Sequence, residues 1–465
     1  MEKLTIREIE KAVGGALLFG DPEGAVDSVA SDSREVLPGG LFAAIPGERV
    51  DGHDFIAAAA AAGCAAALVS REEWKDKERA RQAGLAAILT EDTVAALQRL
   101  AAWYLDRFSL VKVGVTGSTG KTTTKEMLYH ILSRRYRTVR NPGNLNSPVG
   151  LSRSIFQIER DTEAAVFEMG MDHLGEIRSL AAMVRPHAAV ITNVGLSHIG
   201  QLGSRENLLK AKLEITELLG AEDVLAVNWD NDLLSAVSYP GPYHLVKVGQ
   251  EGPDLRIEDI EDHGEDGLSF TLRTEKEQAS FRLGIPGRHN AWNCALAAAA
   301  GLACGVSLEE AALGLQELES TDKRLHIIKA GGIKIIDDSY NASPDSVKAA
   351  LNVLLTVKAR RKVAVLADMF ELGPETDRLH YQTGRYAGGC ADLVLAVGTQ
   401  GRFIAGGAKD ACGALVRHFE TRQELEEEIK GLVKEGDAVL VKGSRGMAMD
   451  RIVKILEGSM EGHGL

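Results

Sequence analysis

Residues 111–135 have the sequence VKVGVTGSTGKTTTKEMLYHILSRR, and this stretch decides the fold around it. Apolar side chains alternate at Val111, Val113 and Val115, which predicts a buried strand. A turn of small residues follows, and apolar residues then recur at helical spacing from Met127. A strand, a small-residue loop and a helix N-terminus form an anion cradle, because backbone N–H groups and the helix dipole converge on one point.

The loop between this strand and helix predicts a site for a nucleoside triphosphate. It matches the short GxxGKT pattern, since residue 115 is valine. The amine of Lys121 can reach the outer phosphates, and the hydroxyl of Thr122 can ligate magnesium. A plain glycine-rich turn would leave Lys121 and three threonines without a role. The predicted loop residues are Gly117, Ser118, Thr119, Gly120, Lys121, Thr122 and Thr123.

Composition describes an ordinary globular protein and excludes some partners. The 465 residues are long enough for two to four domains, with 45% hydrophobic and 26% charged residues. The formal net charge is -13, and acidic and basic residues are interspersed. This argues against nucleic acid or an anionic membrane as the main partner. A polyphosphate substrate would therefore need a local basic pocket.

The cysteines and the hydrophobic runs predict a cytoplasmic protein. None of the five cysteines forms a CxxC pair, and each lies among small residues, so we expect buried thiols in a reducing compartment. Their positions are Cys64, Cys294, Cys304, Cys390 and Cys412. The N-terminal segment has no secretory apolar region, and no stretch approaches the about 18 apolar residues of a membrane span.

Alternating strands and helices predict an α/β fold of three domains. Residues 1–89 would form a small N-terminal α/β domain that binds substrate. Residues 90–320 would form the central P-loop domain on a mostly parallel sheet, with an antiparallel excursion over residues 255–283. Residues 321–465 would form a C-terminal, Rossmann-like, doubly wound domain.

Two polar residues follow apolar strands that come after the phosphate loop. Glu168 ends the strand over residues 164–167, and His198 lies a few residues beyond the strand over residues 188–192. Ligands of open α/β sheets bind at the carboxyl ends of strands. A lone Glu or His at such a place is usually structural. Two of them after a GKT loop indicate contact with a metal or nucleotide.

Several other polar segments have two interpretations. The clusters at residues 31–34 and 47–53 could bind a ligand or could simply be turns. Residues 206–219 predict a helix whose charge pairs, Glu206 with Lys210 and Lys210 with Glu214, suggest a solvated face. The segment KGSRG at residues 442–446 follows a predicted strand and could hold an anion.

The chain lacks an NKxD guanine motif and a DxxG after the second strand, which weakens a GTPase interpretation. Two flanking domains suggest that the nucleotide domain brings two other molecules together. A ligase that couples ATP cleavage to amide formation fits this arrangement. Magnesium on Thr122 and Glu168 would neutralise the triphosphate, and an amine would then attack an acyl phosphate.

Motifs across the whole chain resemble the Mur ligase family. In the central domain they are TGSTGKTT, NPGNLNSPVG, FEMGMDHLGEI, ITNVGLSHI and KAKLEI. In the flanks they are SDSREVLPGGLFAAIPGERVDGHDFI, GRHNAWNCALAAAA, IIDDSYNASPDSVKAAL, ADMFELGPETDRLH and LVKGSRGM. Within the family, the chain is most similar to the ligases that add D-alanyl-D-alanine to UDP-N-acetylmuramoyl tripeptide. The resemblance thus implies ATP and these two molecules as substrates, in peptidoglycan precursor synthesis, and a monomer.

The resemblance also implies the catalytic centre. Lys121 would contact the β- and γ-phosphates, and Thr122 and Glu168 would hold one of two Mg²⁺ ions. His198 matches a ligand of the second ion. Lys212 matches the lysine that the family carbamylates, which turns a cation into a carboxylate-like ligand. This favours Lys212 as the functional lysine and leaves Lys210 in solvent.

Further roles follow for the substrate-binding surfaces. Nucleotide contacts are implied for Asn290 near adenine and for Arg324 and Asp338, which would close over the nucleotide from the C-terminal domain. Substrate contacts are implied for Ser33 and Arg34 at the uridine diphosphate, for Asn144 and Asn146 further along, and for Asn341. Two alternatives remain: a related ligase with another amine donor, such as a diamino acid, and a non-ligase P-loop NTPase.

Overall fold

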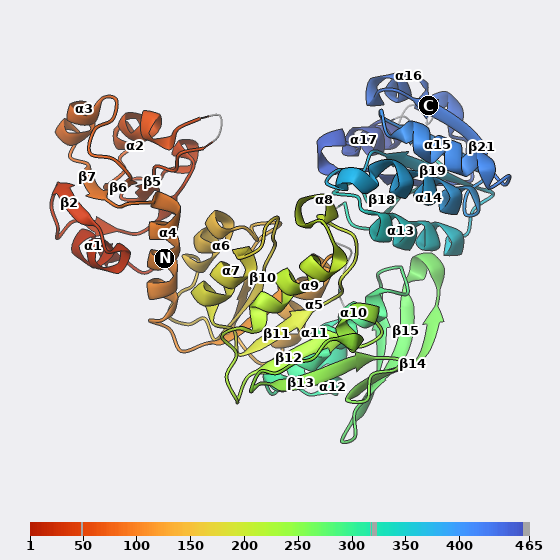
Figure 1. The fold of residues 1–465 in the computed structure, drawn as a ribbon, viewed down its shortest axis with the longest axis horizontal. Helices are drawn as coiled ribbons and strands as arrows, with labels where there is room; N and C mark the ends of the chain where they lie inside the picture. Colours follow the sequence, from red (N-terminus) through yellow and green to blue (C-terminus); the bar gives the residue numbers. More distant parts are fainter. Residues whose placement is uncertain (48–49, 317, 319–322, 459–465) are drawn as a thin grey trace.

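Three α/β sheets follow one another along the chain in this computed structural model, which describes residues 1–47, 50–316, 318 and 323–458 (Figure 1). The first sheet has five strands, the second nine and the third six. Figure 1 shows the first and third sheets at opposite ends, with the second between them. The α/β fold class predicted from the sequence is confirmed. The predicted boundary at residues 320 and 321 lies outside the described residues.

The N-terminal sheet has the strand order β2-β7-β6-β5-β4, and β1 pairs separately with β3. Its strands are short and apolar, and α2 covers one face. The elements are β1 (Leu4–Thr5), α1 (Ile6–Val13), β2 (Ala16–Phe19), β3 (Ala25–Val26), β4 (Val29–Ala30), β5 (Leu41–Ala43), α2 (Ile56–Ala61), β6 (Ala66–Val69), α3 (Lys77–Gln82) and β7 (Ala86–Leu89).

Helix α4 (Thr93–Leu105) connects this sheet to the rest of the chain. The carboxylate of Asp92 begins it by accepting from the backbone N–H groups of Val94 and Ala95, at 2.7 and 2.9 Å. Leu97, Leu100 and Tyr104 on its buried face belong to one apolar core that includes residues from both the N-terminal and the central sheets. The two sheets therefore share a core through α4.

The central sheet has the order β16-β15-β14-β13-β12-β11-β8-β10-β9. Strands β9 to β14 run parallel, and β14, β15 and β16 are antiparallel, as predicted for residues 255–283. The elements are β8 (Val111–Thr116), α5 (Lys121–Leu132), β9 (Thr138–Arg140), α6 (Pro148–Ile155), β10 (Ala164–Glu168), α7 (Glu176–Val184), β11 (Ala188–Ile191), α8 (Ile199–Leu202), α9 (Arg205–Leu213), β12 (Val224–Asn228), α10 (Asp232–Ala236), β13 (His244–Gly249), β14 (Leu255–Asp262), β15 (Leu268–Arg273), β16 (Gln278–Leu283), α11 (Asn290–Ala303) and α12 (Leu308–Gly314).

The position of β8 explains where the site forms. It lies between β10 and β11, with Val115 opposite Glu168 and Thr116 opposite Ile191. The phosphate loop, Glu168 and the segment after β11 therefore meet at the carboxyl edge of one sheet. The alanine-rich helix α11 packs against α5, which holds the N-terminus of α5 over this edge.

The C-terminal sheet has the order β17-β18-β22-β19-β20-β21, parallel except for β17 at one edge. Apolar cores on both of its faces give the predicted doubly wound arrangement. The elements are β17 (His326–Ala330), β18 (Ile333–Asp337), α13 (Pro344–Thr356), β19 (Arg361–Ala367), α14 (Thr376–Gly388), β20 (Leu393–Val397), α15 (Gly401–Asp410), β21 (Leu415–Phe419), α16 (Arg422–Leu432), β22 (Asp437–Lys442) and α17 (Asp450–Gly458).

Two predictions about single segments were wrong. Cys412 is exposed at the end of α15, whereas the other four cysteines are buried as expected. The helix predicted over residues 206–219 ends at Leu213, and Glu214 turns inward, because its carboxylate accepts from the N–H groups of Gly175 and Arg178 at 2.7 and 3.1 Å. Lys210 is exposed and does not pair with Glu214. No helix in the described part of the chain is long and apolar enough to cross a membrane.

Candidate functional site

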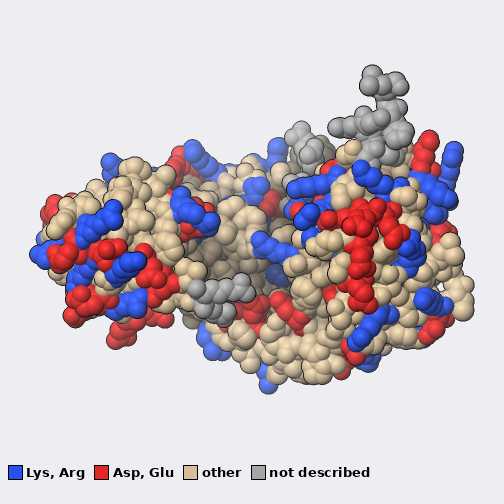
Figure 2. Space-filling model, turned by 90° about the horizontal axis from the view of Figure 1, so that it is seen from above, with Lys and Arg blue, Asp and Glu red and all other residues tan. Residues whose placement is uncertain are grey.

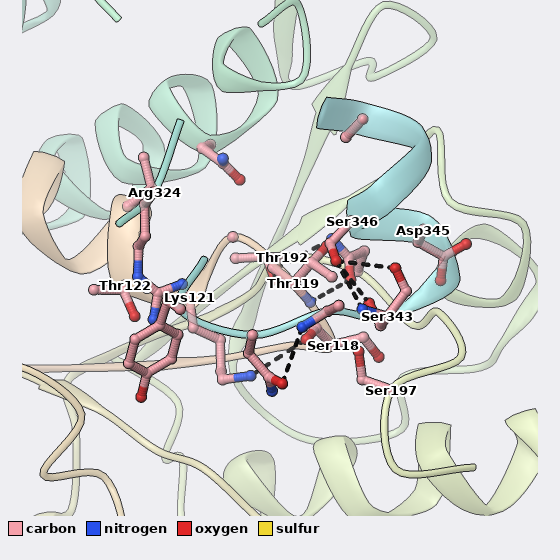
Figure 3. A pocket seen from close by; sticks show the side chains of 18 of the residues that line it. Ser118, Thr119, Lys121, Thr122, Thr192, Ser197, Arg324, Ser343, Asp345 and Ser346 are labelled. Carbon is pink, nitrogen blue, oxygen red and sulfur yellow. Dashed lines mark hydrogen bonds between the residues drawn. The ribbon is translucent and has the colours of Figure 1, made fainter. Parts of the chain in front are cut away.

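A cavity of about 960 Å³ lies between the central and C-terminal sheets. Figure 3 shows Ser118, Lys121 and Thr122 of the phosphate loop facing Ser343 and Asp345 of the C-terminal domain across it. The predicted site residues that line it are Ser118, Thr119, Gly120, Lys121, Thr122, Thr123, Asn144, Asn146, Glu168, His198, Asn290, Arg324, Asp338 and Asn341. The structure therefore brings most of the predicted site together.

The phosphate loop requires glycine at two positions. Gly117 has φ +152°, and a Cβ atom there would lie 1.8 Å from Oγ1 of Thr192. Gly120 has φ +79°, and a Cβ atom there would lie 2.4 Å from Oδ1 of Asn293. The hydroxyl of Thr192 in turn donates to the carbonyl of Thr119 at 2.6 Å. The end of β11 thus holds the loop in shape and admits only glycine beside it.

Lys121 folds back over its own loop. Its Nζ donates to the carbonyl oxygens of Gly117 and Ser118, at 2.8 and 3.4 Å. Burial lowers the pKa of the Lys121 amine, and the nearby carboxylate of Glu168 opposes this shift. The cation is therefore held by two neutral carbonyl groups at the mouth of the anion cradle, where a phosphate can take their place.

Thr122 and Glu168 form the centre of the site. Oγ1 of Thr122 donates to Oε2 of Glu168 at 2.7 Å, and the side chain of Asn146 donates to Oε1 at 2.8 Å. The Glu168 side chain is only 2% exposed. A hydroxyl and a carboxylate that face one cavity are hard oxygen donors, which Mg²⁺ prefers. These residues fit a magnesium ion. Asn146, predicted to contact substrate, orients Glu168 here.

A buried lysine that the sequence did not single out supports this pair. Lys125 is fully buried in α5, and its Nζ donates to the carbonyls of Asn141 and Gly143 at 2.8 and 3.1 Å. The same nitrogen lies 3.2 Å from the Glu126 carboxylate and 3.9 Å from that of Glu168. It thereby ties the loop that carries Asn144 and Asn146 to the floor of the site.

His198 bridges the two domains that form the cavity. Its Nδ1 lies 3.1 Å from Oδ1 of Asp172 and 2.7 Å from Oε2 of Glu371, which belongs to the C-terminal domain. Burial lowers the pKa of His198, but the two carboxylates raise it more, so the net shift is upward. One atom from each of these three side chains lies close enough to share a metal ion. Asp172 and Glu371 lie inside quoted motifs, yet their roles were not predicted.

Lys212 lies in α9 with 1% of its surface exposed. Among the described residues its side-chain amine has no hydrogen bond or ion pair. Burial, and then the charge of Lys121, bring the pKa of the Lys212 amine well below its usual value. An uncharged amine is the form that adds carbon dioxide, so the side chain fits a carbamate. The exposure of Lys210 and the burial of Lys212 agree with Lys212 as the functional lysine of the two.

Asn290 is the first residue of α11, and both the nitrogen and the oxygen of its side-chain amide form hydrogen bonds. It donates to the carbonyl of Pro286 at 2.8 Å and accepts from Asn293 at 2.9 Å. The preceding His289 also lines the cavity, and burial, with the charge of Lys442, lowers its pKa to about 4. The His289 ring beside Asn290 is therefore uncharged at pH 7.

The C-terminal domain contributes several cations to the cavity. The guanidinium of Arg324 stacks over Tyr340, with 4.2 Å from its central carbon to the ring centroid. Lys442 forms a buried ion pair with Asp338 and donates to the carbonyl of Asn341 at 2.9 Å. Burial raises the pKa of Asp338, although Lys442 opposes the shift. Basic side chains from both domains line the cavity, but acidic side chains line it as well, so the cavity as a whole is not basic. Figure 2 shows acidic and basic residues interspersed over the face that it displays.

Ser33 and Arg34 lie outside this cavity, in the N-terminal domain. Asp32 begins the short 3₁₀ turn there by accepting from the N–H of Arg34 at 3.0 Å, and the Arg34 guanidinium pairs with the same carboxylate. No described residue from 1–89 lines the cavity. The predicted contact of Ser33 and Arg34 with the uridine diphosphate stays a prediction.

Comparisons with known proteins agree with this geometry. Family models match residues 25–104 (Mur ligase family, catalytic domain), 115–301 (Mur ligase middle domain) and 323–445 (Mur ligase, glutamate ligase domain). A UDP-N-acetylmuramoyl-tripeptide–D-alanyl-D-alanine ligase of Bacillus subtilis is 39% identical over 98% of this chain and 99% of its own length. The chain belongs to the Mur ligase family. The Escherichia coli enzyme of the same name is 35% identical, with 95% and 96% covered.

Solved structures of Mur ligases share the fold. A crystal structure of MurF from Acinetobacter baumannii superposes with a TM-score of 0.90 and 32% identity, covering 98% of this chain and 99% of that one. A MurF ligase from Thermotoga maritima, solved in complex with ADP, gives 0.82 and 28%, covering 94% and 98%. The Mur ligase resemblance predicted from the sequence motifs is confirmed.

Proposed function

We propose that this chain is an ATP-dependent ligase that joins D-alanyl-D-alanine to UDP-N-acetylmuramoyl tripeptide. The observation that carries the proposal is the Thr122–Glu168 pair beside the phosphate loop, facing a second domain across one cavity. The names of the full-length relatives supply the two substrates, and the MurF–ADP complex supports ATP as the nucleotide. The product would be a precursor of peptidoglycan.

The residues act by positioning and charge neutralisation. Backbone N–H groups of the loop bind the triphosphate, and Lys121 leaves its two carbonyl partners to contact the outer phosphates. The γ-phosphoryl group passes to the terminal carboxylate of the tripeptide, giving an acyl phosphate and ADP. The amine of the dipeptide then attacks the acyl carbon, and phosphate leaves as the amide forms.

Thr122, Glu168, His198 and carbamylated Lys212 would hold two Mg²⁺ ions, whose charge would neutralise the triphosphate. Glu168 is kept in place by Asn146, and Lys125 adds a buried positive charge near it. Lys212 contributes a negative charge only as its carbamate, and the lowered pKa of its amine favours the uncharged form that adds carbon dioxide. Asn290, Arg324 and Asp338 would bind the nucleotide, and Asn341 the amine substrate.

The remaining assignments extend the proposal to the domains. The N-terminal domain, through Ser33 and Arg34, would bind the uridine diphosphate, with Asn144 nearer the cavity. The central domain would bind ATP, and the C-terminal domain the incoming amine. We further propose that the enzyme works as a monomer in the cytoplasm, where these phosphorylated precursors would be made.

One assay tests the proposal and its alternatives. Phosphate release from ATP is measured with UDP-N-acetylmuramoyl tripeptide, with and without D-alanyl-D-alanine, and then with single amino acids. We expect release that depends on both the tripeptide and the dipeptide. Release with a diamino acid and the UDP-muramoyl dipeptide would favour the related ligase. Release independent of both substrates would identify a non-ligase NTPase and overturn the proposal.

A further inference from the structure

A lysine to which the proposed reaction gives no contact with a ligand lies beneath the loop of residues 141–147. This loop joins β9 to α6 and carries Asn144 and Asn146. The Lys125 side chain below it is fully buried and does not line the cavity, so its amine is not placed to contact a ligand there. A buried cation lowers stability unless its surroundings satisfy its donors. The partners of this amine therefore indicate what the lysine does.

The amine of Lys125 forms its hydrogen bonds with the backbone of the loop. It donates to the carbonyl oxygens of Asn141 and Gly143, at 2.8 and 3.1 Å. The same nitrogen lies 3.2 Å from the Glu126 carboxylate and 3.9 Å from that of Glu168. The contact with Glu168, the predicted magnesium ligand, is thus the longest of the four. These distances indicate that the cation holds the loop rather than the metal-binding carboxylate.

The side chain of Asn141 joins this end of the loop to the end of β10. Asn141 is 0% exposed, and its Oδ1 accepts from the N–H of Glu168 at 2.8 Å. Its Nδ2 donates to the carbonyls of Leu145 and Glu168, at 2.8 and 3.3 Å. One amide therefore bonds the backbone of Glu168 on both sides, while Lys125 holds the carbonyl of the same asparagine.

The other end of the loop returns to the same carboxylate. The side chain of Asn146 donates to Oε1 of Glu168 at 2.8 Å, and its carbonyl accepts from the N–H of Gly170 at 2.9 Å. A Cβ atom at Gly170 would lie 2.9 Å from Cγ of Asn146, so glycine admits the loop this close to β10. Both ends of the loop are thus attached around Glu168, with Asn144 between them.

We propose that Lys125 is a positioning residue that holds the loop of residues 141–147 in the conformation that binds the uridine substrate. This inference rests on the proposed function, in which Asn144 and Asn146 contact UDP-N-acetylmuramoyl tripeptide. Without the amine, the carbonyls of Asn141 and Gly143 lose the buried donor that they share. The loop must then move to find other donors, and it carries Asn144 and Asn146 away from their positions.

The test measures two affinities of the full-length enzyme by calorimetry with magnesium present. One is for ADP, and the other is for UDP-N-acetylmuramoyl tripeptide with ADP bound. Lys125→Met keeps the length of the side chain and removes its donors. We expect affinity for the tripeptide to fall by about 10- to 100-fold, as for lost hydrogen bonds to a charged group, with affinity for ADP unchanged. A loss confined to ADP would mean that Lys125 acts through the charge of Glu168, and would overturn the proposal.

A second variant reaches the same attachment from the solvent side, in case Lys125→Met does not fold. Gly143 is exposed, has φ +53°, and has no atom within 4 Å of a Cβ added to it. Gly143→Val strains this left-handed backbone and displaces the carbonyl that Lys125 holds, without entering the core. It should lower affinity for the tripeptide selectively, as Lys125→Met does. Wild-type affinity in Gly143→Val would contradict the proposal.

A double-mutant cycle tests whether Lys125 acts through Asn146. Combined with Asn146→Ala, Lys125→Met should weaken tripeptide binding by clearly less than the product of the two single losses. Multiplied losses would mean that the two residues act separately, against the proposal. Arg137→Met is the control, because it removes only an exposed ion pair with Asp161 at the other end of β9. Failure of wild type to bind the tripeptide would instead count against the proposed function.

Discussion

Nδ1 of His198 lies 2.7 Å from Oε2 of Glu371, and this contact joins the central domain to the C-terminal domain. The N–H of Gly200 donates to the Glu371 carbonyl at 2.8 Å, and the N–H of Leu196 donates to Asp345 at the same distance. A short segment after β11 therefore carries both a predicted metal ligand and several of the contacts between the two domains. Movement of one domain relative to the other would therefore shift His198 in the site.

Removing this carboxylate should loosen the segment. In Glu371→Ala the ion pair with His198 is lost, while the backbone bond to Gly200 can remain. We expect the Leu196 and Gly200 amides to exchange with deuterium about 3- to 10-fold faster, as for a loss of one partly buried polar contact. Glu375→Ala, which removes only an exposed pair with Arg378, is the control. Unchanged exchange rates in Glu371→Ala would mean that the contact between His198 and Glu371 does not stabilise this segment.

The two lysines of α9 should differ sharply on substitution. Lys212→Ala should lose turnover by at least about 100-fold, since a charged group in the catalytic centre disappears. Lys210→Ala should be nearly silent, because Lys210 is exposed. Added short carboxylic acids should restore part of the activity of Lys212→Ala. With ¹³C-labelled carbon dioxide, a carbamate resonance should appear in wild type and in Lys210→Ala, and be absent from Lys212→Ala. Equal losses from both substitutions would contradict this assignment.

Gly117 should tolerate no side chain. In Gly117→Ala the new Cβ would meet the Thr192 hydroxyl, which itself supports the loop. We expect nucleotide affinity to fall by about 100-fold or more, because the cradle must open to relieve the clash. Gly14 is the matched control, with φ +62° and no atom within 4 Å of the Cβ that alanine would add. Gly14→Ala should cost about 1 kcal/mol of stability and leave nucleotide binding, measured by calorimetry, as in wild type.

His289 should make the folded state less stable in mild acid. Its pKa is about 4 in the folded protein, mainly because of burial, and near 6.5 when unfolded. Between these values the unfolded chain binds the extra proton, so stability falls as pH decreases from 6.5 toward 4. We expect the protonation of His289 to lower the free energy of unfolding by about 1 to 3 kcal/mol over this range. Urea titrations at several pH values in this range give the free energy of unfolding at each pH. This free energy should change less steeply with pH in His289→Asn than in wild type; an identical pH dependence would contradict the prediction.

Local patterns predicted the elements that meet at the site. The alternation before the GKT loop, the strand that ends at Glu168 and the alanine-rich helix at Asn290 all lie where periodicity placed them. Glycine and threonine content was enough to predict the phosphate loop, because its chemistry depends on backbone geometry in one continuous segment. The resemblance added Lys212, whose burial the charge pattern alone had hidden.

Contacts between distant segments could not be predicted in this way. Lys125 follows three threonines in an amphipathic helix, and nothing local shows that its amine reaches Asn141 and Glu168. Glu214 has the spacing of a surface ion pair, but the N-terminus of α7 offers it unpaired N–H groups. Glu371 meets His198 only after two domains have come together. In each case the partner is set by tertiary packing.

The core shared through α4 has a consequence for how the molecule unfolds. Because Leu97 and Leu100 pack with residues of both neighbouring sheets, the first two domains should melt as a single cooperative unit. The C-terminal sheet has its own cores on its two faces, and Leu196 and Ile199 of the central domain pack against one of them. This contact is small beside the core shared through α4, so the C-terminal domain should melt in a separate step. Scanning calorimetry would then resolve two heat-absorption peaks. Ligands that contact both sides of the cavity would reduce the difference between the two transition temperatures.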